Sequence, residues 1–302
     1  MRVMILGSGG VGGYVGAQLI RHTEAEVTMI ARGAHLEAIR NKGLQILEDE
    51  ERSTVHPAHA TDRPDDLGRF DLILVAVKST ALEESLELIS KNIDENTVLL
   101  PLLNGVDHDR ILHRRYPLAD VLQGCIYILS NILEPGVIRK KGAIFRLCWG
   151  RPDFDPRDYA AIAELFDAAG LRHKPTEQIE FEAWKKFLFI SPMAALTSLH
   201  DRPMDRIASE HGDELRTLLD ELLALAQARG IPLGEKEREQ TLTQAAKVLP
   251  GAKTSMQLDF EQGKPPELES LVGHVVREGS RLGTPTPFYG QIYEELKKRL
   301  NP

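Results

Sequence analysis

The sequence predicts an α/β protein in which a doubly wound, mostly parallel sheet is followed by an all-helical domain. Short apolar runs alternate with amphipathic, helix-length stretches through roughly the first hundred residues. A glycine-rich turn follows the first apolar run, and helical periodicity dominates after Gly170. Alternating elements of these lengths imply right-handed crossovers between parallel strands.

The first half contains the strands expected in the sheet and the helices that connect them. The strands are predicted at residues 2–6, 26–30, 71–77 and 97–103, with helices from the glycine turn to about residue 22 and at 34–41 and 81–92. Residues 43–58, which are acidic at their centre, predict a hairpin. Branched residues around the turns EPG and KKG in residues 121–149 predict antiparallel strands at the edge of the sheet.

The second half is predicted to be helical. The expected helices cover residues 181–198, 209–229, 235–248, 254–262 and 267–281. A polar stretch around Pro175 is typical of a linker. We therefore expect two domains, residues 1–175 and residues 176–302, which suits the length of the chain.

Composition excludes several classes of protein. The 45 acidic and 37 basic residues give a net charge of −8 without any block of basic residues, so nucleic acid is not an expected partner. No stretch reaches the roughly 18 uninterrupted apolar residues of a membrane span. Two cysteines, Cys125 and Cys148, cannot form a secretory disulfide framework or a four-cysteine zinc site. We expect a cytoplasmic protein that binds no metal. Whether it forms a homodimer is left open by the sequence.

The glycine-rich turn matches the dinucleotide-binding pattern G-x-G-x-x-G. It follows the first strand, opens a helix and consists of Gly7, Ser8, Gly9, Gly10, Val11 and Gly12. In this pattern the first glycine makes the tight turn, the second lets the backbone approach a pyrophosphate, and the third permits close packing of helix on strand. The free N–H groups of the helix N-terminus bind the phosphates. This context predicts a Rossmann-like domain, although an ordinary glycine-rich turn is the alternative.

The residue after the second strand indicates which cofactor is used. Enzymes that use NAD usually place an acid there, whereas this chain has Arg32 and no carboxylate until Glu37. A guanidinium can bind the 2′-phosphate of NADP with two hydrogen bonds. We therefore predict NADP(H) as the cofactor; the alternative is a surface arginine at the end of a strand.

Two further residues follow strands whose carboxyl ends meet at the same edge of the sheet. Lys78 ends the run VAVK, and Asn104 follows TVLLPLL. Because ligands of open α/β sheets lie beyond the carboxyl ends of the strands, both are candidates for binding the cofactor. A solvated lysine and a simple Asn-Gly turn are the alternatives.

Residues 183–199, AWKKFLFISPMAALTSL, place Lys185 and Lys186 at the head of a long uncharged run. The run predicts a buried helix, in which lysine is unusual unless it has a function. Burial and a neighbouring cation would lower the pKa of a lysine toward the range useful for proton transfer. The alternative is the solvated end of a core helix.

Taken together, these motifs resemble the ketopantoate reductase (2-dehydropantoate 2-reductase) family. The resemblance covers GSGGVG, ARG, VAVKS, LLNGV, WKK and TSMQLD, which are spread along nearly the whole chain. It implies an NADP-dependent oxidoreductase with a Rossmann domain, a helical domain and a 2-keto acid substrate. It also implies that Lys186 is the general acid, that Ser255 binds the substrate carboxylate, that Glu267 is a catalytically important acid contacting substrate, and that Asn104 helps to position substrate or nicotinamide.

The chain departs from the family pattern on the helix that begins near Lys186. The family commonly has asparagine four and eight residues further on, lining the substrate pocket, whereas this chain has Ile190 and Ala194. Positions at four-residue spacing share a helix face, so the change falls on the expected substrate surface. Pro192, in the middle of this helix, can kink it and shift the register of this face.

The sequence thus predicts reduction of ketopantoate to pantoate, a step of pantothenate biosynthesis, with NADPH. Two alternatives stay open: a related reductase for a more apolar 2-keto acid, and a non-catalytic regulator that binds NADP. Retention of Lys186, Ser255 and Glu267 argues against the regulator, because a sensor needs none of them.

Overall fold

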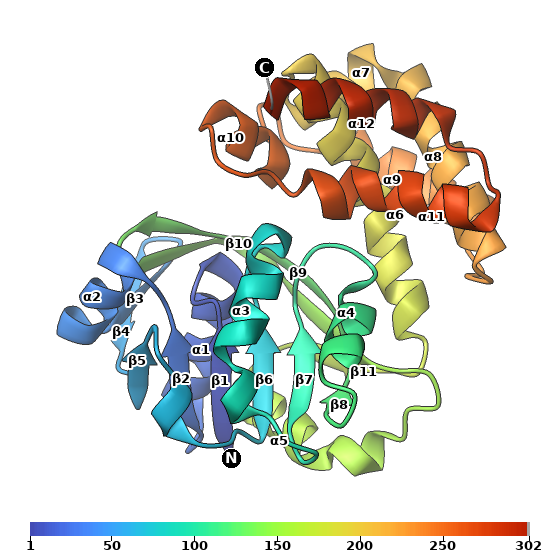
Figure 1. The fold of residues 1–302 in the computed structure, drawn as a ribbon. Coiled ribbons are helices and arrows are strands. Elements are labelled where there is room, and N and C mark those ends of the chain that lie inside the picture. Colours follow the sequence, from blue (N-terminus) through green and yellow to red (C-terminus); the bar gives the residue numbers. More distant parts are fainter. Residues whose placement is uncertain (301–302) are drawn as a thin grey trace. The chain divides into compact units, whose positions relative to one another are not determined.

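A six-stranded parallel sheet forms the centre of the N-terminal part of the chain (Figure 1). The computed structural model describes residues 1–300. The strands are β1 (Arg2–Leu6), β2 (Glu26–Ile30), β5 (His59–Thr61), β6 (Leu72–Val75), β7 (Val98–Pro101) and β8 (Asp120–Val121), in the spatial order β5-β2-β1-β6-β7-β8. Counted along the chain, these parallel strands follow the order 3-2-1-4-5-6 of doubly wound dinucleotide-binding sheets. The predicted fold class is confirmed.

Alternating side chains of β1 reach two different cores. Val3 and Ile5 belong to one apolar cluster, whereas Met4 and Leu6 belong to the other. A strand buried on both faces has no polar alternation, which explains why its sequence is a continuous apolar run. Helices therefore cover both faces of the sheet: α1 (Gly10–His22), α2 (Gly33–Lys42), α3 (Leu82–Leu88), α4 (His108–Arg115) and α5 (Ala160–Ala168).

Helix α3 is shorter than the predicted helix over residues 81–92. Short 3₁₀ turns flank it at Ser79–Ala81 and Ser90–Asn92. The fully buried side chain of Asn92 donates to the carbonyls of Pro64 (2.9 Å) and Gly68 (2.7 Å), which fixes the turn instead of extending the helix. Helices α4 and α5 were not predicted.

A second sheet contains the hairpins. It comprises β3 (Leu44–Glu48), β4 (Glu51–Val55), β9 (Gln123–Glu134), β10 (Val137–Gly150) and β11 (His173–Pro175), in the order β11-β10-β3-β4 with β9 paired to β10. The hairpin predicted over residues 43–58 is present as β3 and β4. The prediction that residues 121–149 extend the edge of the first sheet is wrong, because β9 and β10 pair with each other and β10 pairs with β3 and β11. The predicted linker around Pro175 is strand β11.

Helix α1 packs against strands of both sheets, and its glycines make this possible. A Cβ atom at Gly16 would lie 2.6 Å from the side chain of Met29 in the first sheet. On the other side, a Cβ atom at Gly10 would lie 2.5 Å from the carbonyl oxygen of Ser130 in β9. Side chains at these positions would push the layers apart, so the glycines of this segment are needed for packing.

The described chain divides into two compact units. The first comprises Met1–Leu103 and Asp107–Ile179, and the second joins Asn104–Val106 to the chain from Glu180 onward. The second unit is helical, with α6 (Ile179–His200), α7 (Met204–Glu210), α8 (Gly212–Ala228), α9 (Glu235–Ala245), α10 (Ser255–Glu261), a π-helical turn at Glu269–Gly273, α11 (His274–Leu282) and α12 (Pro287–Leu300). The domain limits expected from the sequence, 1–175 and 176–302, stay a prediction.

Two helices of the second unit differ from expectation. The helix predicted over residues 209–229 is interrupted at His211, which separates α7 from α8. Helix α12 was not predicted, although Pro287 at its start and basic residues in its last turn are helix signals. Its first turn is held by Glu221 of α8, whose carboxylate accepts from the backbone N–H groups of Phe288 (2.8 Å) and Tyr289 (3.0 Å).

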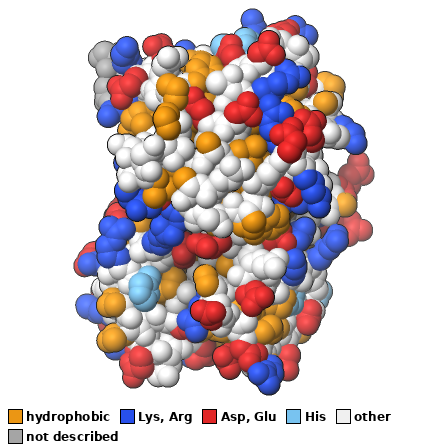
Figure 2. All heavy atoms as spheres, turned by 90° about the vertical axis from the view of Figure 1, so that its right-hand side faces the viewer, with side chains coloured by type: hydrophobic (Ala, Val, Ile, Leu, Met, Phe, Trp, Pro, Cys, Tyr) orange, Lys and Arg blue, Asp and Glu red, His pale blue; other side chains and the backbone are white. Residues whose placement is uncertain are grey.

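The surface carries both signs of charge. Figure 2 shows Lys and Arg side chains interspersed with Asp and Glu on the face that it presents. Among residues 1–300, no helix combines the length and apolarity needed to cross a membrane.

Candidate active site

The glycine loop joins the end of β1 to the start of α1. Gly7 has φ +98°, and a Cβ atom there would lie 2.8 Å from the backbone nitrogen of Val77. A Cβ atom at Gly12 would lie 2.1 Å from the carbonyl oxygen of Gly7, whereas one at Gly9 would meet nothing within 4 Å. Gly9 is the N-cap of α1 and no side chain caps the helix. A tight turn, open space at the second glycine and an uncapped helix N-terminus suit a pyrophosphate group.

The side chain of Ser8 holds this loop against the neighbouring strand. Its hydroxyl and its backbone N–H both donate to the carbonyl of Ile30 at the end of β2, each at 3.0 Å. The side chain is 3% exposed. Val11, in the first turn of α1, packs against the core of the first unit. The side chains of Ser8 and Val11 therefore stabilise the loop, and the backbone N–H of Ser8 is used within the protein.

His35 of α2 supports the same loop and was not predicted from the sequence. The backbone N–H of Gly136 donates to its Nδ1 (3.0 Å), so the ring proton lies on Nε2, which donates to the carbonyl of Ser8 (2.8 Å). Burial lowers the pKa of His35, and the hydrogen bond to Ser8 offsets part of that shift. The neutral imidazole thus connects the glycine loop with the β9–β10 turn. The sequence contains no motif that signals this role.

Arg32 lies two residues after the end of β2, at the position expected for the residue that selects the cofactor. Its backbone is the N-cap of α2, and its side chain is 51% exposed. The guanidinium Nη1 lies 2.8 Å from a carboxylate oxygen of Glu84 in α3. An exposed ion pair of this kind contributes about 0–1 kcal/mol, so a phosphate can displace Glu84 at small cost.

Lys78 follows the end of β6, the strand next to β1 in the sheet. The residue is exposed and forms the N-cap of the 3₁₀ turn at Ser79–Ala81. Its carbonyl accepts from the backbone N–H of Ala81 (2.9 Å). Lys78 therefore lies at the same carboxyl edge of the parallel sheet as the glycine loop.

The second unit brings Lys186 and Asn104 together. The Nζ of Lys186 donates to Oδ1 of Asn104 at 2.8 Å, although the two residues are 82 positions apart. Asn104 follows β7 and belongs to the short segment that is part of the second unit. Both Lys185 and Lys186 are half-buried. The sequence predicted both residues of the pair, but it did not predict their contact.

An ion-pair cluster centred on the buried side chains of Arg229 and Glu278 contacts α6 at Trp184, two residues before Lys186. The guanidinium of Arg229 lies 5.4 Å from the ring centroid of Trp184 and pairs with Glu278 of α11. Arg281 donates to the same carboxylate at 2.7 and 2.8 Å. The Arg281 hydrogen bonds and the Arg229 charge outweigh the effect of burial and lower the pKa of Glu278 to about 2.

Ser255 and Glu267 are both at the N-terminal ends of helices in the second unit. Ser255 is the exposed first residue of α10, next to the N-cap Thr254. Glu267 is 5% exposed, and its carbonyl accepts from the backbone N–H of Leu271 (3.0 Å) and from the hydroxyl of Ser270 (3.2 Å). The π-helical turn begins two residues later. Such turns frequently occur at functional sites.

Helix α6 continues through Pro192, so Lys186, Ile190 and Ala194 keep their four-residue spacing on one helix. The hydroxyls that could replace the missing amides are used inside the second unit. Ser191 donates to the carbonyl of Leu271 (2.7 Å), and Thr197 donates to the carbonyl of Met193 (2.7 Å). Neither hydroxyl substitutes for an asparagine at Ile190 or Ala194.

These features define a dinucleotide-binding α/β protein joined to a helical unit that carries a half-buried lysine. The family model described as Ketopantoate reductase PanE/ApbA matches residues 3–153, and the model of its C-terminal part matches residues 178–300. The chain belongs to the ketopantoate reductase family. Members of this family are oxidoreductases that act on CH–OH groups with a nicotinamide cofactor.

Individual relatives are similar to this chain over 94–99% of their own length. The chain is 29% identical to a 2-dehydropantoate 2-reductase of Mesorhizobium japonicum, covering 95% of this chain and 94% of the relative. It is 28% identical to an uncharacterized oxidoreductase, YkpB, of Bacillus subtilis, with 98% of each chain covered. The crystal structure of 2-dehydropantoate 2-reductase from Porphyromonas gingivalis W83 superposes with a TM-score of 0.85 at 33% identity, covering 98% of this chain and 99% of that one.

Proposed function

We propose that this chain reduces 2-dehydropantoate (ketopantoate) to pantoate with NADPH, a step of pantothenate biosynthesis. The observation that carries the proposal is the hydrogen bond from Lys186 Nζ to Asn104 Oδ1. It holds an ammonium group, which has three N–H donors, on the lysine that the resemblance to the family implies is the general acid. Membership of the family supports the reaction class.

The cofactor assignment rests on the first unit. Gly7, Gly9 and Gly12 would hold the pyrophosphate with backbone N–H groups, and Arg32 would bind the 2′-phosphate that distinguishes NADPH from NADH. Lys78 would contribute a second positive charge at this edge of the sheet. When bound, the nicotinamide supplies the hydride that adds to the keto carbon.

The proton step rests on the second unit. As the carbonyl carbon gains hydride, its oxygen takes a proton from the ammonium of Lys186, so that the ketone becomes a secondary alcohol and the lysine becomes a neutral amine. Solvent then restores the lysine proton. Asn104 would orient the ammonium, Ser255 would bind the substrate carboxylate, and Glu267 would bind or orient the substrate.

A second candidate substrate is a more apolar 2-keto acid. Ile190 and Ala194 offer methyl groups where the family commonly has amides, and the hydroxyls of Ser191 and Thr197 are bonded elsewhere. A substrate hydroxyl placed there would lose water without gaining a partner, at about 1–3 kcal/mol. We therefore infer that this chain accepts keto acids without the 4-hydroxyl group better than a typical ketopantoate reductase does.

The test is NADPH oxidation with ketopantoate and with its 4-deoxy analogue, followed at 340 nm (the nicotinamide absorbance). Turnover of either compound supports the reductase, whereas NADPH binding without turnover of any 2-keto acid would support a regulator instead. The substrate preference is tested in Ile190→Asn/Ala194→Asn. We expect the ratio of kcat/KM values to move toward ketopantoate by about 10–150-fold for each restored contact. Strong preference for ketopantoate before the change, and no gain after it, would show that another group binds the hydroxyl.

A further inference from the structure

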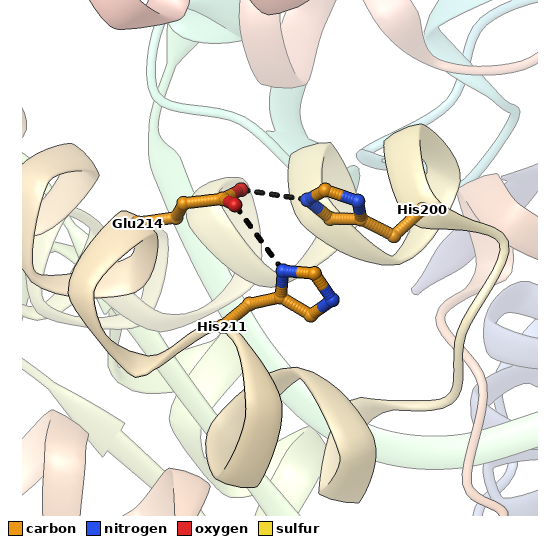
Figure 3. Close-up of side chains that lie close together, drawn as sticks. All are labelled: His200, His211 and Glu214. Carbon is orange, nitrogen blue, oxygen red and sulfur yellow. Dashed lines mark hydrogen bonds and ion pairs between the residues drawn. The ribbon is translucent and has the colours of Figure 1, made fainter.

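Two histidines and a glutamate of the second unit converge where α6, α7 and α8 meet (Figure 3). His200 is the last residue of α6, His211 lies between α7 and α8, and Glu214 is in the first turn of α8. One carboxylate oxygen of Glu214 lies 2.6 Å from Nε2 of His200, and the other lies 3.2 Å from Nδ1 of His211. The reductase chemistry proposed above uses none of these residues.

The arrangement has the dimensions of a metal site. One ligand atom from each residue lies within 4.8 Å of the others. Two donors bound to a tetrahedral zinc ion at about 2.0–2.1 Å from it are roughly 3.3 Å apart. The imidazole rings are stacked, with centroids 3.7 Å apart and planes inclined by 20°. Small side-chain rotations would therefore bring two nitrogens and one oxygen to a common ion.

The backbone keeps these side chains close together. The N–H of His211 donates to the carbonyl of Ile207, and the carbonyl of His211 accepts from Leu215, both at 3.0 Å. Asp201, directly after His200, has φ +52°, which turns the chain sharply out of α6. The three ligands thus come from fifteen consecutive residues, 200–214, whose geometry is set by two helix ends.

Exposure and charge also suit an ion that enters from solvent. The side chains of His200, His211 and Glu214 are 25%, 22% and 35% exposed. At the same end of α6, the guanidinium of Arg299 donates to the carbonyls of Ser198 (3.0 Å) and Leu199 (2.9 Å). The carboxylate of Glu214 contacts both histidines. Two imidazoles, one carboxylate and access for water form the ligand set of many zinc sites.

We propose that His200, His211 and Glu214 bind a divalent transition-metal ion such as Zn²⁺, which fastens the end of α6 to the start of α8. His200 is fourteen residues beyond Lys186 on the same helix, a distance of about 21 Å at 1.5 Å per residue. The ion therefore does not contact the proposed proton donor. Its role is to stabilise the helical unit.

The experiment uses the full-length protein without a histidine tag, stripped of metal with a chelator. Zn²⁺ binding is measured by competition with a chromophoric chelator, and Co²⁺ is used as a spectroscopic probe. We expect one Zn²⁺ per chain with a Kd below about 10 µM, a rise in Tm of several degrees at saturation, and visible absorption typical of tetrahedral Co²⁺. Glu214→Gln and His211→Ala should each weaken binding by at least about 10-fold.

The matched control is His113→Ala, which removes an exposed histidine of α4 in the first unit. It should leave the Kd for Zn²⁺ unchanged. Saturable binding that persists in His200→Ala/His211→Ala, or no binding tighter than about 100 µM in the unmodified protein, would overturn the proposal and leave a carboxylate-bridged histidine pair. Because the readouts are metal affinity and Tm, the result is independent of whether ketopantoate is the substrate.

Discussion

The glycine loop and the surroundings of Lys186 are two different kinds of proposed site. The loop occupies six consecutive residues, Gly7 to Gly12, and offers mainly backbone groups. The Lys186 site depends on a side-chain hydrogen bond to Asn104, 82 residues away, and on a helix held by Arg229 and Glu278. A site built from backbone groups is encoded by neighbouring residues, whereas a proton-transfer site built from side chains depends on tertiary packing. Substitutions should therefore separate cofactor binding from chemistry.

The largest effect is expected at Lys186. Lys186→Ala removes the proposed proton donor, so kcat should fall by about 10²–10⁴-fold while the Kd for NADPH stays within about twofold. Steady-state kinetics and NADPH fluorescence titration measure the two quantities. Lys185→Ala is the control and should reduce kcat far less. If Lys185→Ala had the larger effect, the helix register would be displaced by one residue and Ile190 and Ala194 would be misassigned as well.

The next effect concerns the stability of the second unit. Because the pKa of Glu278 is lowered from 4.5 to about 2, its ion pairs stabilise the fold fully above about pH 4.5 and lose this contribution as pH falls toward 2. Glu278→Gln leaves the buried Arg229 without its charge partner and should cost about 2–3 kcal/mol of unfolding free energy at pH 7.

Urea unfolding at pH 7 and pH 3, followed by circular dichroism, tests this prediction. The difference between the unmodified protein and Glu278→Gln should shrink at the lower pH. NADPH affinity, which depends on the first unit, should be unchanged in the variant. An equal difference at both pH values would show that the carboxylate of Glu278 does not titrate as its contacts predict.

A substitution at Arg32 tests the proposed preference for NADPH over NADH. A charge-assisted contact with the 2′-phosphate contributes about 1.5–3 kcal/mol, so Arg32→Ala should raise the KM for NADPH by about 10–100-fold and change that for NADH little. Glu84→Gln is the matched control, because it removes only the exposed partner of Arg32 and should leave the KM for NADPH unchanged or slightly lower. Equal use of NADPH and NADH by the unmodified protein would contradict the assignment.

His35 has the smallest expected effect. His35→Ala removes the bond that supports the Ser8 carbonyl, so the Kd for NADPH should rise by about 3–10-fold, corresponding to roughly 1 kcal/mol. Since the pKa of His35 is lowered, the neutral imidazole stabilises the glycine loop fully above the ordinary pKa of 6.5. This stabilisation is lost as pH falls through the lower folded-state pKa. NADPH affinity should therefore fall below pH 6.5 more steeply in the unmodified protein than in His35→Gln.

Exposed His22, at the end of α1, provides the control. His22→Gln should keep both the affinity and the pH profile of the unmodified protein. If His35→Gln retained the full acid dependence, another group would be responsible for it.

The sequence predicted what is encoded by neighbouring residues. The parallel strands, the glycine turn and the position of Arg32 follow from apolar runs and a short motif. The partner of Lys186 and the role of His35 do not, because each depends on segments brought together by the fold. Strands β9 and β10 were assigned to the wrong sheet for the same reason: their sequence pattern identifies them as strands but does not identify the strands they pair with.

A double-mutant cycle tests most directly whether cofactor selection and proton transfer are separate. The kcat/KM for ketopantoate is measured at sub-saturating NADPH in Arg32→Ala, in Lys186→Ala and in the double variant. If the first unit binds NADPH and Lys186 acts only in the chemical step, the two losses should multiply, with a coupling energy below about 0.5 kcal/mol. A double variant no slower than Lys186→Ala alone would contradict this division of roles.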